Sequence, residues 1–382
     1  MELLFAVYEA RGLLLCLGLA VYLVYKVWVY RRLSAFKGPF SSGWSEAWSS
    51  VTTGRQQMAL GYSGKENLEL EDTVDTYIGK LIHLIRSKYL STPDFTQPFD
   101  FGKKTQYLAV DIINAIGLGA PLGNLDTDSD RYRYIETTEM GFKIGKIFLA
   151  LGLLPLIQNR WVMGLLAPLG EDGLRFGWPL RNARARIDER LQQETETRSD
   201  MLASFVRHGL TRDQLVNESL LQLIAGSDTI STSIRALFLY LLTHRRVYAT
   251  LQAEVDAAVA NGTAPPAPGV ISEAGSRSLP YLQACIKEGM RVRPPAGALV
   301  PKRVPDGGDT IVVDGKPVFL PGGTNIGVSM FALQLNKGVF GEDAEEFRPE
   351  RWLFEKDEKR LATMHRVQEL IFGYVFWMEA KS

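Results

Sequence analysis

The longest uninterrupted helical pattern in the sequence covers residues 211–243. It contains no proline, and Thr211 followed three residues later by Gln214 forms a capping box that predicts where the helix begins. Its apolar residues recur at helical spacing: Leu215, Leu220, Leu221, Leu223, Ile224, Ile230, Ile234, Leu237, Leu239 and Leu241. About thirty residues at roughly 1.5 Å each give a helix of roughly 45 Å, enough to cross a whole domain. We therefore expect the chain to fold around this one helix.

Helical patterns also dominate the chain outside this segment. Further helical candidates lie at residues 68–85, 106–118 and 134–154. Strand patterns are confined to one short region, where residues 311–313 and 317–320 predict a hairpin and residues 325–330 a further strand. Strands and helices do not alternate in the way that builds a nucleotide-binding doubly wound sheet. The sequence therefore predicts a mainly α fold with a small β region.

The charge balance and the cysteine count exclude several classes of function. The 382 residues include 43 Lys plus Arg and 43 Asp plus Glu, so the net charge of zero offers no global field to attract nucleic acid. The two cysteines, Cys16 and Cys285, are too few for a zinc cluster. The four histidines show no metal-ligand spacing; they are His83, His208, His244 and His365. We expect neither a nucleic-acid partner nor a metal-binding residue.

The N-terminus carries an apolar segment at residues 12–30, interrupted only by Lys26. Nineteen residues span roughly 28 Å as a helix, about the thickness of a bilayer core. Arg31 and Arg32 follow, which favours a cytosolic position for the rest of the chain. The alternatives are a cleaved signal peptide or a buried helix, but a signal peptide has its positive charge before the apolar stretch. The sequence predicts a single transmembrane anchor at residues 1–32, a Pro/Gly hinge at 33–52 and a globular part at 53–382.

The middle of the long helix holds an unusual group of small and polar residues at 225–229. Glycine inside a helix costs up to about 1 kcal/mol relative to alanine, so Gly226 predicts that another element packs closely there. The Thr229 hydroxyl can bond to a carbonyl one turn earlier, and Asp228 beside it is titratable. The alternative is a helix crossing through small residues, with a back-bonded threonine and no catalytic role.

A second polar motif lies near the end of a later helix that stops before Pro294. Glu288 and Arg291 are three residues apart, so they share one helix face and can form an ion pair. The spacing alone is weak, because Glu345 and Arg348 repeat it. After it come the hairpin pattern, a Pro-Gly-Gly-Thr turn at residues 321–324, and the segment Phe-Arg-Pro-Glu-Arg-Trp at residues 347–352.

These motifs, in this order, resemble the cytochrome P450 family, and with the predicted anchor they are similar to its microsomal fungal branch, near the pisatin-demethylase-like enzymes. The resemblance covers residues 1 to about 50 and about 60 to 374. It implies haem b bound between the long helix and a later helix, and electrons from a membrane-bound NADPH–cytochrome P450 reductase. It also implies residence in the endoplasmic reticulum membrane and oxidation of an apolar small molecule, in fungal secondary metabolism.

The resemblance also implies roles for individual residues. Asp228 and Thr229 match the acid–alcohol pair that relays protons to iron-bound dioxygen, and Gly226 matches the position where the helix loosens beside the cofactor. Glu288 and Arg291 match a buried structural pair, and Arg348 is expected to complete its triad. Lys302 or Arg303 lies where the family often has a basic residue near a haem propionate, and the sequence does not decide between them.

The sequence departs from the family pattern at two places. The family's axial cysteine thiolate follows a Phe-Gly loop; here Phe372 and Gly373 begin that loop, residues 375–382 diverge, and no cysteine follows Cys285. Part of the N-terminal haem-pocket region also has no counterpart near Val51. These departures predict a truncated form, with a retained intron or an altered gene model as one hypothesis. Two functions therefore stay open: a haem-thiolate monooxygenase, or a catalytically inactive, truncated P450-like membrane protein.

Overall fold

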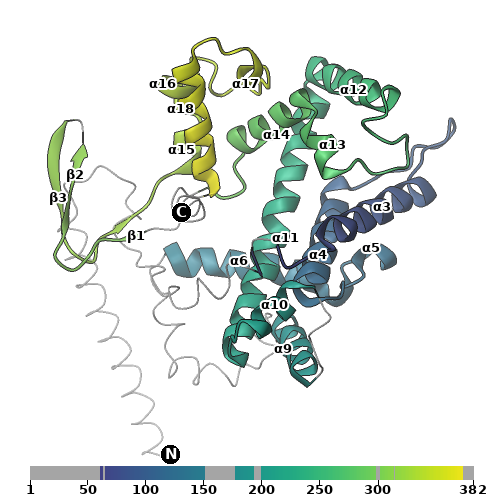
Figure 1. Cartoon of the computed structure of the whole chain (residues 1–382), viewed down its shortest axis with the longest axis horizontal. Helices are drawn as coiled ribbons and strands as arrows, with labels where there is room; N and C mark the ends of the chain where they lie inside the picture. Colours follow the sequence, from purple (N-terminus) through teal and green to yellow (C-terminus); the bar gives the residue numbers. More distant parts are fainter. Residues whose placement is uncertain are drawn as a thin grey trace, which may run out of the picture. The chain divides into compact units, whose positions relative to one another are not determined.

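The computed structural model describes residues 61–62, 65–150, 177–192, 199–297, 302–313 and 315–372. These residues are mostly helical, as the sequence predicts (Figure 1). Among them no helix combines the length and the hydropathy that crossing a membrane requires. The predicted anchor at 1–32 and the predicted hinge at 33–52 lie outside the described residues.

The described chain divides into two compact units. The larger unit holds residues up to 138, then 177–297 and 326–372, and the smaller one holds 139–150 and 302–325. The helices of the larger unit are α3 (Leu70–Lys88), α4 (Phe101–Leu118), α5 (Asn124–Thr127), α9 (Gly177–Gln192), α10 (Met201–Arg207), α11 (Arg212–Thr243), α12 (Arg245–Ala260), α13 (Glu273–Arg277), α14 (Pro280–Val292), α15 (Met330–Gln334), α16 (Lys337–Phe340), α17 (Arg351–Phe354) and α18 (Glu358–Glu369), with the short 3-10 helices η2 (Arg131–Arg133) and η4 (Leu370–Phe372). Helix α6 (Tyr134–Ala150) continues from the larger unit into the smaller one.

Helix α11 is the predicted long helix, and it begins where the capping box places it. The backbone N–H of Gln214 donates to Thr211 Oγ1 at 3.4 Å, and the backbone N–H of Thr211 donates to Gln214 Oε1 at 2.8 Å. The helix lies against α4, α9 and α14 (Figure 1). A core of buried apolar side chains joins α4, α9, α10 and α11; it includes Val110, Leu118, Ile187, Leu202, Phe205, Leu215 and Leu223. Burial of these side chains holds α11 in place.

The β region is smaller than the sequence predicts. Strands β2 (Asp309–Val313) and β3 (Lys316–Leu320) form the expected antiparallel hairpin, with Ile311 opposite Val318. Strand β1 (Lys302–Arg303) pairs with β4 (Asn325–Ile326). The prediction of a strand through residue 330 is wrong, because the Ser329 hydroxyl accepts a hydrogen bond from the Ala332 N–H at 3.3 Å and starts α15.

Candidate active site

The polar turn of α11 presents a narrow stripe on one face of the helix. Thr229 Oγ1 donates a hydrogen bond to the Ala225 carbonyl at 2.7 Å, as the sequence predicts for a back-bonded threonine. Leu221, Ala225 and Thr229 follow each other at intervals of four residues and therefore share this face. Leu221 and Ala225 are exposed, and Thr229 and its neighbour Asp228 are half-buried. The stripe offers an apolar surface that ends at a hydroxyl, with a carboxyl next to it in the chain.

Gly226 lies on a different face of the helix, against α4. A Cβ atom at this position would lie 2.7 Å from Ile113 Cδ1 and 2.8 Å from Ile113 Cγ1, far inside normal contact distance. The prediction that another element packs closely against this glycine is therefore confirmed. The expected contact of Gly226 with a cofactor stays a prediction. Gly226 contacts Ile113, and it is the neighbouring Ala225 that lies on the exposed stripe.

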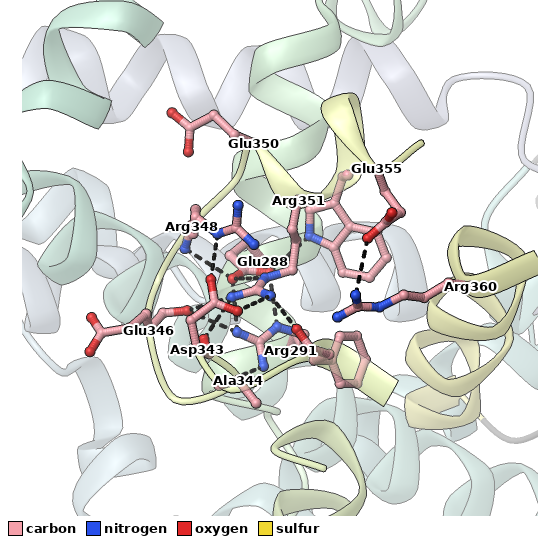
Figure 2. A network of polar contacts seen from close by, with 12 residues as sticks. Glu288, Arg291, Asp343, Ala344, Glu346, Arg348, Glu350, Arg351, Glu355 and Arg360 are labelled. Atoms are coloured by element: carbon pink, nitrogen blue, oxygen red, sulfur yellow. Dashed lines mark hydrogen bonds and ion pairs between the residues drawn. The ribbon is translucent and has the colours of Figure 1, made fainter. Parts of the chain in front are cut away.

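A network of buried charges surrounds Glu288 of α14 (Figure 2). Its Oε1 accepts hydrogen bonds from Arg291 Nη2 at 2.8 Å, Arg351 Nε at 2.8 Å and the Arg348 backbone N–H at 3.0 Å. Its Oε2 accepts from Arg291 Nε and Trp352 Nε1, each at 2.9 Å. Glu288 and Arg291 are fully buried, and Arg351 is 3% exposed. The carboxylate has its lone pairs filled by donors from two segments of the chain, α14 and residues 348–352, and the network therefore ties these segments together.

The prediction that Arg348 completes the triad is wrong; Arg351 does so. The Arg348 side chain is 47% exposed and pairs with Asp343 Oδ2 at 2.6 Å, while only its backbone N–H reaches Glu288 (Figure 2). The chain turns between residues 347 and 351, so the arginine that opens α17 points inward. The neighbouring residues in the sequence do not separate the two arginines, because Arg351 stands beside Trp352 and Arg348 beside Phe347, and both aromatic side chains are buried.

The two buried arginines also hold the loop that precedes α17. Arg291 donates to the carbonyls of Gln334 at 2.8 Å, Ala344 at 2.5 Å and Glu346 at 3.0 Å. Arg351 donates to the carbonyls of Phe340 and Asp343, both at 2.8 Å. Each guanidinium therefore satisfies backbone groups that would otherwise be buried without partners.

Asp343 supplies a second negative charge at the edge of this network. Its Oδ1 lies 3.3 Å from Arg351 Nη1, and its Oδ2 pairs with Arg348. Burial alone would raise the pKa of the Asp343 carboxyl, but the positive charges of Arg351 and Arg348 bring it below the ordinary value. Asp343 therefore stays ionised at neutral pH and partly balances the excess of arginine.

Lys302 and Arg303, the two predicted propionate partners, form strand β1 in the smaller unit. The Arg303 side chain is exposed, and its Nη2 lies 3.2 Å from where a Cβ of Gly323 would be. The Lys302 side chain lies outside the description. A role for either residue at a haem propionate stays a prediction.

The described residues include no cysteine suited to be the axial thiolate ligand of a haem. Their one cysteine, Cys285, is fully buried in α14, in a cluster that includes Leu241, Val247 and Tyr281. Burial raises the pKa of the Cys285 thiol to about 12, and nearby carboxylates, Glu350 first among them, add to the rise. A thiol of this kind is protonated at neutral pH, whereas a metal ligand must be a thiolate.

Two of the four histidines have one ring nitrogen close to a backbone carbonyl of their own helix. His208 and His244 each place Nδ1 2.8 Å from a backbone carbonyl of their own helical turn. His365 packs against the Trp352 ring, and burial lowers the pKa of its imidazole. Among the described residues no three of the His, Cys, Asp or Glu type gather as a metal site.

The comparison with protein families matches residues 46–373 to cytochrome P450. The chain belongs to this family. The cytochrome P450 monooxygenase ABA1 of Pyricularia oryzae is 38% identical over 331 residues, which cover 83% of this chain and 62% of that protein. Pisatin demethylase of Fusarium vanettenii is 29% identical over 309 residues, 78% of this chain and 56% of the relative. These relatives are fungal, as the motifs predict.

Coverage of the relatives differs. The chain spans less than two thirds of the length of the ABA1 and pisatin demethylase proteins. Against the cytochrome P450 monooxygenase ACRTS1 of Alternaria alternata, 30% identity extends over 333 residues, 84% of both proteins. The family relationship therefore establishes the fold of the shared region. It does not by itself establish the activity of the whole protein.

Proposed function

We propose that the protein, in a form that carries the axial cysteine, functions as a monooxygenase of the cytochrome P450 type that oxidises an apolar small molecule in fungal secondary metabolism. Membership of the family and similarity to the fungal monooxygenases ABA1 and ACRTS1 support the reaction class. The proposed cofactor is haem b, and the proposed electron donor is NADPH–cytochrome P450 reductase. Residues 1–32 would anchor the protein once in the endoplasmic reticulum membrane, with the globular part in the cytosol.

The observation that carries this proposal is the stripe on α11. Leu221 and Ala225 give an exposed apolar surface, which suits an apolar guest better than a charged one. Asp228 and Thr229 stand at its end, half-buried, where a carboxyl and a hydroxyl can exchange protons with water or with a bound molecule. A bound haem would supply the oxygen chemistry, and these two residues would hold and pass protons.

A second candidate function rests on the state of Cys285. The family's axial ligand is a thiolate, and the described chain offers only this buried, protonated thiol. A polypeptide made of these 382 residues would then be a catalytically inactive, P450-like membrane protein. Under this proposal Glu288, Arg291 and Arg351 still hold the fold, because their network needs no cofactor.

Reconstituted turnover separates the two functions. We expect the 382-residue polypeptide, placed in lipid bilayers with the reductase and NADPH, to consume no more NADPH than the reductase alone when apolar compounds are added. Sequencing the transcript comes first, because it decides whether a message also encodes a cysteine-bearing continuation in place of residues 375–382. If that longer polypeptide inserts oxygen into an apolar compound, the monooxygenase proposal holds for it; turnover by the 382-residue form itself would exclude the inactive one.

A further inference from the structure

We propose that Ile113 of α4 is a positioning residue for the α11 turn from Ala225 to Thr229. By packing against the bare Cα of Gly226, it sets how deeply α11 crosses α4 and so fixes where Asp228 and Thr229 lie. The contact stands on the structure alone, whereas its importance for a reaction rests on the proposed function.

The contact with Gly226 is one of three close approaches along the same crossing. Ile113 Cδ1, Cγ1 and Cβ lie 2.7, 2.8 and 3.6 Å from the position that a Cβ of Gly226 would take. One turn further along α4, Gln222 Oε1 lies 3.1 Å from the position that a Cβ of Gly117 would take. Near the start of α4, Arg235 Cδ lies 3.4 Å from the position that a Cβ of Gly102 would take.

These pairs define the geometry of the crossing. As the residue number rises along α4, the partner number on α11 falls, so the two helices are antiparallel where they meet. Positions 113 and 117 are four apart, and so are 222 and 226, which is the spacing of ridges that pack into grooves. A side chain at position 226 would push this ridge out of its groove.

The part of Ile113 that approaches Gly226 cannot give way easily. Cγ1 is one bond from the branched Cβ, and a β-branched side chain on a helix has one strongly preferred rotamer. Alanine at position 226 must therefore displace α11 itself. Thr229 is tied to Ala225 by its hydroxyl at 2.7 Å, and Ser227 to Leu223 at 2.6 Å, so the turn moves as a unit and carries Asp228 with it.

Gly79 provides a matched control. It also lies inside a helix, α3, but no atom lies within 4 Å of where its Cβ would be. Alanine forms helices better than glycine, so Gly79→Ala should leave the melting temperature unchanged or raise it. The same substitution at Gly226 meets Ile113 and should lower it.

The test is a thermal-unfolding comparison of the full chain carrying Gly226→Ala, Ile113→Ala, both substitutions, or Gly79→Ala. We expect Gly226→Ala to lower the melting temperature by several degrees when Ile113 is present, and to leave it unchanged or raise it when residue 113 is alanine. Hydrogen exchange of the amides at 225–229 should quicken in the single Gly226 variant and return to the Ile113→Ala rate in the double variant.

This reversal separates positioning from a general loss of stability. A Gly226→Ala effect of the same size and sign in both backgrounds would overturn the proposal, and so would a gain in stability like that of Gly79→Ala. Neither readout depends on turnover. If the reversal is observed and no form of the protein is active, the contact between Ile113 and Gly226 stands and the proposed function fails.

Discussion

Replacing Glu288 by glutamine will destabilise the fold by about 3–5 kcal/mol, because the substitution leaves two buried guanidinium groups without their carboxylate. The Glu288 side chain is fully buried where it accepts hydrogen bonds from Arg291 and Arg351, so water cannot take the place of the carboxylate. Thermal unfolding of the full chain in detergent, followed by circular dichroism, should show a fall in melting temperature of roughly 5 °C.

Glu345 is the matched control for this experiment. It stands three residues before an arginine, as Glu288 does, but it is exposed. Glu345→Gln should change the free energy of unfolding by less than about 0.5 kcal/mol. Equal effects of the two substitutions would mean that the Glu288 network does not hold the fold together.

The second large effect concerns the two arginines on either side of the turn into α17. Arg351→Met will cost about 3 kcal/mol, because it removes a charge partner of Glu288 and the donor to the buried carbonyl of Phe340. Arg348→Met will cost at most about 1 kcal/mol, since that side chain is 47% exposed and pairs at the surface.

Denaturant unfolding of the two variants decides between the arginines. A double-mutant cycle with Glu288→Gln adds a check, because the coupling energy should be large for Arg351 and near zero for the side chain of Arg348. If Arg348→Met proved the more damaging substitution, the triad drawn from the structure would be wrong and the assignment from the sequence right.

Local signals in the sequence predicted the elements that local physics determines. The capping box at Thr211 and the apolar period set the start and length of α11, and the spacing of Glu288 and Arg291 on one helix face set their ion pair. The hairpin of β2 and β3 followed from its strand patterns and the turn between them.

The misses come from interactions between distant segments. Which arginine reaches Glu288 depends on how the chain turns before α17, 60 or more residues from Glu288, and no spacing rule reports that. The glycine at position 226 indicated a close neighbour, but only the structure identifies Ile113. The end of β4 at Ile326 is a different case, because Ser329 caps α15 and a serine at a helix start is a local signal in the sequence.

The reduced, carbon monoxide-bound absorption spectrum of the purified 382-residue protein, supplied with haem, tests the central claim most directly. We expect no thiolate-type band, at pH 7 or at pH 9, because the pKa of Cys285 near 12 keeps its thiol protonated at both values. Cys285→Ser should leave the spectrum unchanged. A thiolate-type band would contradict the account, and its loss in Cys285→Ser would identify Cys285 as the ligand.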